Sequence, residues 1–185
     1  MVSEQTQILP KLRGSDSAKI VGLIADTHVP VRARNLPKEV FKIFENAEFI
    51  VHAGDLVNLS VIEELEQIAP VLAVYGNMDE PDVRNKLPKM DSFKFFDWKI
   101  GVMHDPGARF GIGKMREIAR QNKFSVLVYG HTHSPHVKWD ADILFINPGS
   151  PTNPIPPFLV KPSVALLRIS KEKIAPEVVQ IRLFE

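Results

Sequence analysis

The sequence predicts an α/β fold, in which two β-sheets pack against each other as a sandwich and helices flank them. In residues 19–76, short apolar runs alternate with helical patterns, which is typical of parallel strands joined by helical crossovers. The second half of the chain is richer in strand patterns, several of them paired across short turns. No internal repeat or linker divides the chain, so we expect one domain over 19–185, preceded by a flexible lead-in at 1–18.

Three buried strands and two helices are expected in the first part of the chain. The strands are the apolar runs at 19–25, 48–53 and 70–76. One helix is expected over 36–46, where Pro37 suits the first turn. The other helix begins at Ser60, whose spacing to Glu63 matches a capping box.

Paired strands dominate the expectation for the second part of the chain. Hairpins are expected over 92–104, over 136–149, and between the runs at 163–170 and 178–184. A helix over 113–123 and a strand over 125–130 separate the first two hairpins. The segment 151–162 carries five prolines, so we expect a long loop there.

The composition excludes several classes of protein. Cysteine is absent, which excludes disulfides and thiolate metal ligands and makes the cytoplasm the default location. The net charge is only +1, so there is no basic excess of the kind that nucleic-acid binding requires. Neither a run of about 20 apolar residues nor a signal-peptide pattern occurs, so no membrane association is expected.

Polar residues follow five of the expected strands, at the points where these strands end. The segments are ADTH (25–28), AGDL (53–56), YGNMDE (75–80), MHDPG (103–107) and YGHTH (129–133). In open α/β sheets, ligands bind at the carboxyl ends of the strands. We therefore expect these segments to converge on one crevice.

The residue types in these segments suit a pair of metal ions. The seven candidate ligands are Asp26, His28, Asp55, Asn77, His104, His131 and His133. Asp26 and His28 are two residues apart, so in extended backbone both side chains point to one face. The same spacing separates His131 from His133. Asp55 can bridge two ions, and a nitrogen and oxygen set without sulfur favours Mn²⁺, Fe, Co²⁺, Ni²⁺ or Zn²⁺ over Mg²⁺ or Ca²⁺.

Each segment has a simpler explanation when it stands alone. An Asp-x-His pair is usually an Asp that caps a turn, and Gly-Asp and Gly-Asn pairs are common turn sequences. An isolated His-x-His pair is more often not a metal site. These explanations do not account for all five segments at strand ends in this order.

The ordered motifs resemble those of the calcineurin-like metallophosphoesterases. They are Asp-x-His, Gly-Asp, Gly-Asn-x-Asp, His, Gly-His-Thr-His and Asn-Pro-Gly-Ser, and they are most similar to those of small single-domain archaeal and bacterial phosphodiesterases. The resemblance covers residues 19–170 and implies a four-layer αββα sandwich. It also implies two divalent transition-metal ions as cofactors, with Mn or Ni favoured.

The resemblance implies a role for each candidate ligand. The first ion is assigned Asp26, His28, Asp55 and His133, and the second is assigned Asp55, Asn77, His104 and His131. A hydroxide held between the two ions would attack phosphorus in line, while the ions stabilise charge on the non-bridging oxygens. Asp55, Asn77 and His104 are therefore expected to take part in catalysis as well as in metal binding.

Two positions depart from the family pattern. Many members have His after the motif Asn, where it is thought to protonate the leaving group, but here the residue is Met78. Because proton donation is worth about 10²–10⁴-fold, its loss favours a diesterase that prefers good leaving groups. Asp79 is a candidate replacement acid, with a turn cap as the alternative. Asp105 stands where members often have Gly, and it would repel an anionic substrate or hold His104.

Other polar residues near these segments have two possible roles. His52 is expected to be packed or to support a ligand, and His136 is expected at the surface. The arginines that follow ligand strands are Arg32, Arg34 and Arg109. Arg32 and Arg109 are candidates for binding the substrate phosphate, with solvated surface arginines as the alternative.

The predicted function is that of a metal-dependent phosphodiesterase acting on a small phosphoester. A phosphomonoesterase or nucleotide pyrophosphatase is the alternative within the same chemistry. A non-catalytic metal-binding scaffold is a third, because the chain also resembles the retromer subunit with this fold around 26–37 and after the Asn-Pro-Gly-Ser turn. That subunit has a degraded metal site, whereas no ligand position is lost here, which favours an enzyme. The loop at 151–162 is expected to cover the site or to form a contact in a homo-oligomer.

Overall fold

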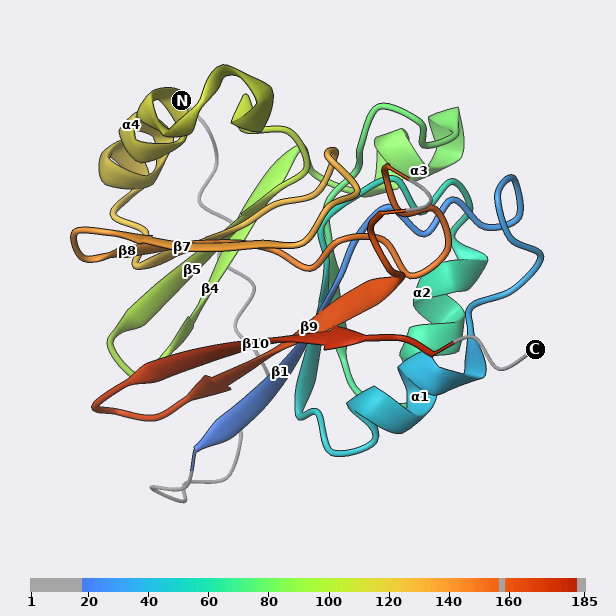
Figure 1. The fold of residues 1–185 in the computed structure, drawn as a ribbon, viewed down its shortest axis with the longest axis horizontal. Coiled ribbons are helices and arrows are strands. Elements are labelled where there is room, and N and C mark those ends of the chain that lie inside the picture. The colour runs from blue at the N-terminus through green and yellow to red at the C-terminus, as the bar shows by residue number, and fades with distance from the viewer. Residues whose placement is uncertain (1–17, 157–158, 183–185) are drawn as a thin grey trace.

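Two β-sheets form the centre of the structure, a computed structural model that describes residues 18–156 and 159–182. The strands of the first sheet are β1 (Lys19–Ile24), β2 (Phe49–His52), β3 (Val71–Ala73), β9 (Ser163–Ile169) and β10 (Ile174–Gln180). Those of the second are β4 (Met90–Phe95), β5 (Trp98–Met103), β6 (Val126–Val128), β7 (His136–Asp140) and β8 (Ile143–Asn147). The strand orders are β10-β9-β1-β2-β3 and β4-β5-β6-β8-β7 (Figure 1). Positions 1–17 of the predicted lead-in lie outside the described residues.

Helices cover the outer faces of both sheets, as predicted. They are α1 (Lys38–Phe44), α2 (Ser60–Leu65), α3 (Pro81–Lys86), the short 3₁₀ helix η1 (Ala108–Phe110) and α4 (Ile112–Asn122). Figure 1 shows α1 and α2 beside the first sheet and α4 on the opposite side of the molecule, beside the second sheet. The structure is therefore the αββα sandwich that the resemblance implied.

Three apolar clusters hold these layers together. The inner faces of the two sheets form one cluster, in which Val21 and Val51 of the first sheet share a core with Val102 and Val128 of the second. A second cluster packs α1 and α2 on the first sheet, and a third packs α4 on the second sheet. Burial of a side chain of this size contributes about 1.5–3 kcal/mol, so strands that are apolar on both faces are stabilised by the facing sheet on one side and by helices on the other.

Most of the predicted pairings are confirmed, and one local prediction is wrong. β1, β2 and β3 are parallel, and the three predicted hairpins form as β4–β5, β7–β8 and β9–β10. The predicted capping box does not form, because α2 has Leu59 at its N-cap and no side-chain cap there. Instead, the backbone N–H of Ser60 donates to the side-chain oxygen of Asn58, 3.0 Å away.

Candidate metal centre

The seven predicted ligands meet where strands of both sheets end. Asp26 follows β1, Asp55 follows β2, and Asn77 follows β3 in the first sheet. His104 follows β5 directly, and the turn that carries His131 follows β6 in the second sheet. The parallel strands of each sheet run toward the same edge, so the sandwich brings together side chains that are up to 107 positions apart in the sequence, from 26 to 133.

Four of these residues form a compact, buried group, which we call the Asp26 group. Ligand atoms of Asp26, His28, Asp55 and His133 all lie within 4.8 Å of one another. Nε2 of His133 lies 3.2 Å from Nε2 of His28 and 3.5 Å from Oδ1 of Asp26. Each of the four side chains belongs to a residue that is at most 7% exposed. This is the set that the family resemblance assigned to the first ion.

The remaining three residues form a second group around Asn77, which we call the Asn77 group. Oδ1 of Asn77 lies 3.1 Å from Nε2 of His104 and 3.0 Å from Nδ1 of His131. Oδ2 of Asp55 connects the two groups, since it lies 3.3 Å from Nε2 of His104 and 3.8 Å from Nε2 of His28. The structure thus brings all seven residues together, and their roles as metal ligands stay a prediction.

The backbone at the ligands is left-handed, which differs from the expected extended geometry. The φ angles are 53° at Asp26, 46° at His28, 57° at Asp55, 70° at His131 and 58° at His133. The two i, i+2 pairs therefore converge through sharp turns and not through strand alternation. A non-glycine residue in this region costs about 1–3 kcal/mol and is typical of functional sites, where the surrounding structure enforces it.

Two glycines allow the backbone to approach the shared carboxylate. Gly54 has φ 87°, which suits glycine, and a side chain there would also meet the ring of His104 at 2.8 Å. Gly76 needs no unusual φ, but a Cβ at this position would lie 2.2 Å from Oδ1 of Asp55. Glycine at these positions therefore reflects the crowding around Asp55.

Backbone carbonyl groups orient two of the imidazoles. Nδ1 of His133 lies 2.6 Å from the carbonyl oxygen of Asn153, and Nδ1 of His104 lies 2.8 Å from that of Ala53. Because a carbonyl only accepts, each Nδ1 carries the proton, and in the neutral ring the Nε2 lone pair faces the cluster. The sequence did not indicate Asn153, which belongs to the Pro-rich loop and holds a ligand in place.

The same loop also forms hydrogen bonds with the backbone of the segment that carries Asp26 and His28. The hydroxyl of Ser150 donates to the carbonyl oxygen of Asp26 at 2.7 Å, and that of Thr152 donates to the carbonyl oxygen of Thr27 at 2.7 Å. These contacts tie the Asn-Pro-Gly-Ser turn to the first ligand segment across both sheets. The described part of the loop thus has a structural role that its proline content did not reveal.

The protonation properties of the Asp26 group fit a bound cation. Burial raises the pKa of Asp26 to about 7, and its Oδ2 is a buried acceptor with no hydrogen-bond partner in the described structure. Burial also lowers the pKa of His28 to about 4 and lowers that of His133, so both rings are neutral near pH 7. An unsatisfied buried acceptor costs about 1–3 kcal/mol, and a divalent cation would satisfy it together with the facing lone pairs.

The contacts of Asp79 favour the turn cap over the leaving-group acid. Its carboxylate accepts the backbone N–H groups of Gly76 at 2.6 Å, Val57 at 2.5 Å and Asp55 at 3.2 Å. The residue is 4% exposed, so it is occupied by the backbone and is poorly placed to reach a substrate. Asp79 therefore braces the turns that carry Asp55 and Asn77.

The two departures from the family pattern lie at the edge of the site. Met78 is 51% exposed, and its backbone N–H donates to Oδ1 of Asp55 at 2.7 Å. One of the two roles expected for Asp105 was to hold His104, and the structure does not show this contact. The carboxylate of Asp105 lies 3.7 Å from Nε2 of His131 and accepts the N–H of Gly107 at 2.8 Å. Asp105 thus adds negative charge beside the Asn77 group.

His52 is a packed residue outside the ligand cluster, as expected. It is fully buried, its Nε2 lies 3.0 Å from the hydroxyl of Thr27, and its Nδ1 accepts the N–H of Gly54 at 3.2 Å. Burial lowers its pKa to about 3, so the ring is neutral. Its hydrogen bonds link the turns that follow β1 and β2.

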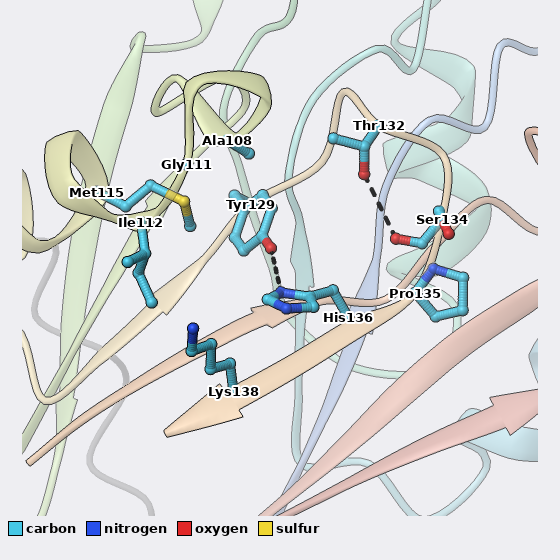
Figure 2. A pocket seen from close by; sticks show the side chains of 10 residues that line it. All are labelled: Ala108, Gly111, Ile112, Met115, Tyr129, Thr132, Ser134, Pro135, His136 and Lys138. Atoms are coloured by element: carbon cyan, nitrogen blue, oxygen red, sulfur yellow. Dashed lines mark hydrogen bonds between the residues drawn. The ribbon is translucent and has the colours of Figure 1, made fainter. Parts of the chain in front are cut away.

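His136 is exposed, as predicted, but it has a specific partner. Its Nδ1 lies 2.7 Å from the hydroxyl of Tyr129, whose pKa burial raises to about 12. Figure 2 shows this pair in a cavity of about 400 Å³ between α4, β7 and the turn at Thr132 and Ser134. None of the seven predicted ligands lines this cavity, so it is separate from the metal centre.

A second cavity, the Asn77 cleft, opens directly onto the ligands. It has a volume of about 360 Å³ and is lined by Tyr75, Gly76, Asn77, Arg84, Lys89, Met103, His104, Asp105 and His131. Its two cations were not predicted, because neither α3, which carries Arg84, nor the segment after it, which carries Lys89, contains a recognisable motif. The predicted phosphate-binding residues Arg32 and Arg109 do not line this cleft, although their charges act on His28 and His131.

A family model for the calcineurin-like phosphoesterase superfamily domain matches residues 20–172. The chain belongs to this superfamily. It is 38% identical over 162 residues to a probable metallophosphoesterase of Methanothermobacter thermautotrophicus, covering 87% of this chain and 92% of that protein. It is 30% identical over 141 residues to a phosphodiesterase of Methanocaldococcus jannaschii, covering 70% of this chain and 82% of that protein.

Solved structures of other proteins have the same fold as this chain. Vps29 of Cryptosporidium parvum superposes with a TM-score of 0.79 at 25% identity, covering 91% of this chain and 94% of that one. Vps29 of Entamoeba histolytica, solved with Zn²⁺, has a TM-score of 0.71 at 26% identity, covering 87% and 98%. The family and the Asp–His cluster together indicate a metal-dependent phosphoesterase with a divalent-metal site. No helix within the described residues is long and apolar enough to span a membrane.

Proposed function

We propose that the protein is a metal-dependent phosphodiesterase with a dinuclear centre. The observation that carries this proposal is the position of Asp55, one of whose carboxylate oxygens lies within 3.8 Å of an imidazole from each ligand group. A shared carboxylate of this kind is what a pair of ions would require. The Methanocaldococcus relative named as a phosphodiesterase supports the choice of substrate.

In this proposal the chain's own residues hold the ions and position the substrate. The Asp26 group, which includes Asp55, would bind the first ion. The Asn77 group would bind the second ion together with Asp55, which both ions would share. Mn²⁺ or Ni²⁺ is favoured over Co²⁺, Fe and Zn²⁺. Bound ions would lower the pKa of a water and neutralise charge on the phosphate oxygens. The backbone N–H of Met78 holds the carboxylate of Asp55 in a fixed orientation, and backbone carbonyl groups do the same for the rings of His104 and His133.

The absence of an acid at Met78 supports a diester with a good leaving group. Met78 supplies no proton, and Asp79 is engaged by three backbone N–H groups. The leaving oxygen would therefore depart as an anion, which is fastest for aryl and other acidic alcohols. A phosphomonoesterase, whose substrate carries more negative charge, remains the alternative within this chemistry.

Hydrolysis assays test this function directly. We expect bis(p-nitrophenyl) phosphate to be cleaved faster than p-nitrophenyl phosphate in the presence of Mn²⁺ or Ni²⁺, with Co²⁺, Zn²⁺ and Mg²⁺ as comparisons. Asp55→Ala serves as the control for contaminating activity. The proposal is refuted if the wild type hydrolyses neither compound faster than this variant with any of the five ions.

A metal-binding scaffold is the second candidate, and the likeness to Vps29 favours it. Because one Vps29 structure was solved with Zn²⁺, metal binding alone would not separate the two candidates. For a scaffold, wild type and Asp55→Ala would both be inactive, and a protein partner would be retained by both. Measurement of activity and of co-purifying partners on the same two samples separates the candidates.

A further inference from the structure

The Asn77 cleft contains more positive charge than a simple phosphodiester requires. Under the proposed function, two divalent ions are balanced by Asp26, Asp55, a hydroxide nucleophile and one singly charged diester. Arg84 and Lys89 add two positive charges to the cleft, and Asp105 offsets one of them. The lining of the cleft therefore carries one net positive charge, because Asp79 is buried behind the turns and does not line the cleft.

Arg84 is fixed in place by the turn that carries Asn77. Its Nε donates to the carbonyl oxygen of Asp79 at 2.8 Å, and its Nη2 donates to that of Asn77. Arginine has five N–H donors, so these two contacts leave others for a ligand. The charge of Arg84 is thus held at a fixed position beside the second ligand group.

Lys89 lies next to the end of β3 and is the more available cation. The N–H of Tyr75 donates to the carbonyl oxygen of Pro88 at 3.1 Å, which holds the segment before Lys89 against the cleft wall. No ion pair is recorded for Lys89 among the residues that the structure describes. Lysine acts as a mobile point charge, so it can reach an anionic group on a bound molecule.

The lining of the cleft is also partly apolar. Tyr75 and Met103 both line the cleft and are only partly buried. A phenol ring and a thioether offer surfaces on which a flat apolar group can pack. The volume of about 360 Å³ is within the range of small-ligand sites.

We propose that the substrate is a phosphodiester in which one ester arm carries a flat apolar portion and a further anionic group. This arm lies in the Asn77 cleft, with its apolar portion against Tyr75 and Met103 and its anionic group at Lys89 and Arg84. The inference rests on the proposed phosphodiesterase function and adds a class of substrate to it.

Three matched substrates test this assignment. Each is a p-nitrophenyl phosphodiester, and the second arm is phenyl, 4-carbamoylphenyl or 4-carboxyphenyl. The leaving group is the same throughout, so differences in kcat/KM report on the second arm. We expect the 4-carboxyphenyl compound to be preferred over the isosteric 4-carbamoylphenyl compound by about fivefold at low salt, the upper range for a partly exposed ion pair.

Two lysine variants locate the preference. In Lys89→Ala, the ratio of kcat/KM between the carboxyl and carbamoyl substrates should fall to about one, and in Lys89→Arg most of the wild-type ratio should be kept. Lys86→Ala is the matched control, because Lys86 is exposed on α3, has the same charge and does not line the cleft. It should leave the ratio unchanged.

The possible outcomes distinguish the inference from the function on which it rests. Hydrolysis of all three compounds at equal rates, or an equal loss of preference in Lys86→Ala and Lys89→Ala, would overturn the cleft assignment and leave a phosphodiesterase. Hydrolysis of none of them with any metal would overturn both. A carboxylate preference that disappears only in Lys89→Ala would support the inference.

Discussion

The Asp26 group and the Asn77 group differ in their access to solvent. In the Asp26 group every residue is at most 7% exposed, and Asn153 and Ser150 hold it from the far side of the sandwich. In the Asn77 group, His104 is also buried, but Asn77 is exposed and His131 is half-buried, and all three line a cleft. The two halves of the centre are therefore not equivalent, although the sequence presents them as similar sets of ligands.

This difference assigns a separate task to each half. A buried set with a carboxylate and neutral imidazoles should bind its ion tightly and exchange it slowly. A set that faces the cleft should bind its ion more weakly, and that ion should meet the substrate. The ion in the Asp26 group would then position the nucleophile, and the ion in the Asn77 group would contact the phosphate oxygens.

The largest effect is expected at the residue that both halves share. Asp55→Ala removes a ligand from both groups, so it should lower kcat/KM for bis(p-nitrophenyl) phosphate by more than about 100-fold. Even partners outside the ligand set typically cost 10–100-fold. Metal content, measured by mass spectrometry after dialysis, should fall at both sites. Retention of both ions with normal activity would contradict the bridging position of Asp55.

Single histidine variants test whether the halves are independent. His133→Ala should weaken the tighter of two binding steps in a calorimetric Mn²⁺ titration, and His131→Ala should weaken the other, each by at least about tenfold. His136→Ala is the control, because His136 lies outside the cluster and bonds Tyr129. If both ligand variants weakened the same step, the division into two groups would be wrong.

A third change adds a proton donor on the side of the Asn77 group. Met78→His places an imidazole at an exposed position next to Asn77, whose Oδ1 contacts His104 and His131. We expect hydrolysis of esters with poor leaving groups to rise by up to about 100-fold, the low end for general-acid catalysis, and little change for p-nitrophenyl esters. Met78→Leu should change neither rate, and an equal increase for both leaving groups would exclude proton donation.

The smallest effect concerns the pH dependence of stability behind the Asp26 group. Burial lowers the pKa of His52 from 6.5 to about 3, so the unfolded chain takes up a proton there that the folded chain does not. Stability should therefore fall as pH falls from about 6.5 toward 3, with His52 contributing up to about 1.4 kcal/mol per pH unit. Urea unfolding of His52→Gln between pH 4.5 and 7 should show a shallower dependence. An unchanged slope would mean that His52 is not the group responsible.

The sequence predicted the architecture well because periodicity reports on burial. The apolar runs that became β1, β2 and β3 pack on both faces, and the strand patterns paired across short turns became hairpins. The convergence of the candidate ligands was also predictable, because strand ends in such a sandwich share an edge, and Asp26, Asp55 and His104 lie within three positions of a strand end.

Features that depend on tertiary contacts could not be predicted. The left-handed backbone at His28 and His133 is one of these features. Histidine is enriched in this conformation among non-glycine residues, but the conformation is uncommon for any of them, so this preference is too weak to predict it. Asn153 contacts Nδ1 of His133 mainly through its backbone carbonyl oxygen at 2.6 Å, with its side-chain nitrogen at 3.3 Å, and any residue type could supply that carbonyl. Lys89 lies at the Asn77 cleft because the carbonyl oxygen of Pro88 accepts a hydrogen bond from the N–H of Tyr75, a contact between residues 13 positions apart.

Under the proposed function, metal binding would offset the strain at the five left-handed candidate ligands and so stabilise the fold. Their strained turns hold the site open in advance, at a cost to the free energy of folding. An ion that binds only the folded chain offsets this cost by RT ln(1 + [ion]/Kd). The melting temperature should accordingly rise with free Mn²⁺ concentration and fall when a chelator is added. The cellular lifetime of the protein would then record how much metal its surroundings supply.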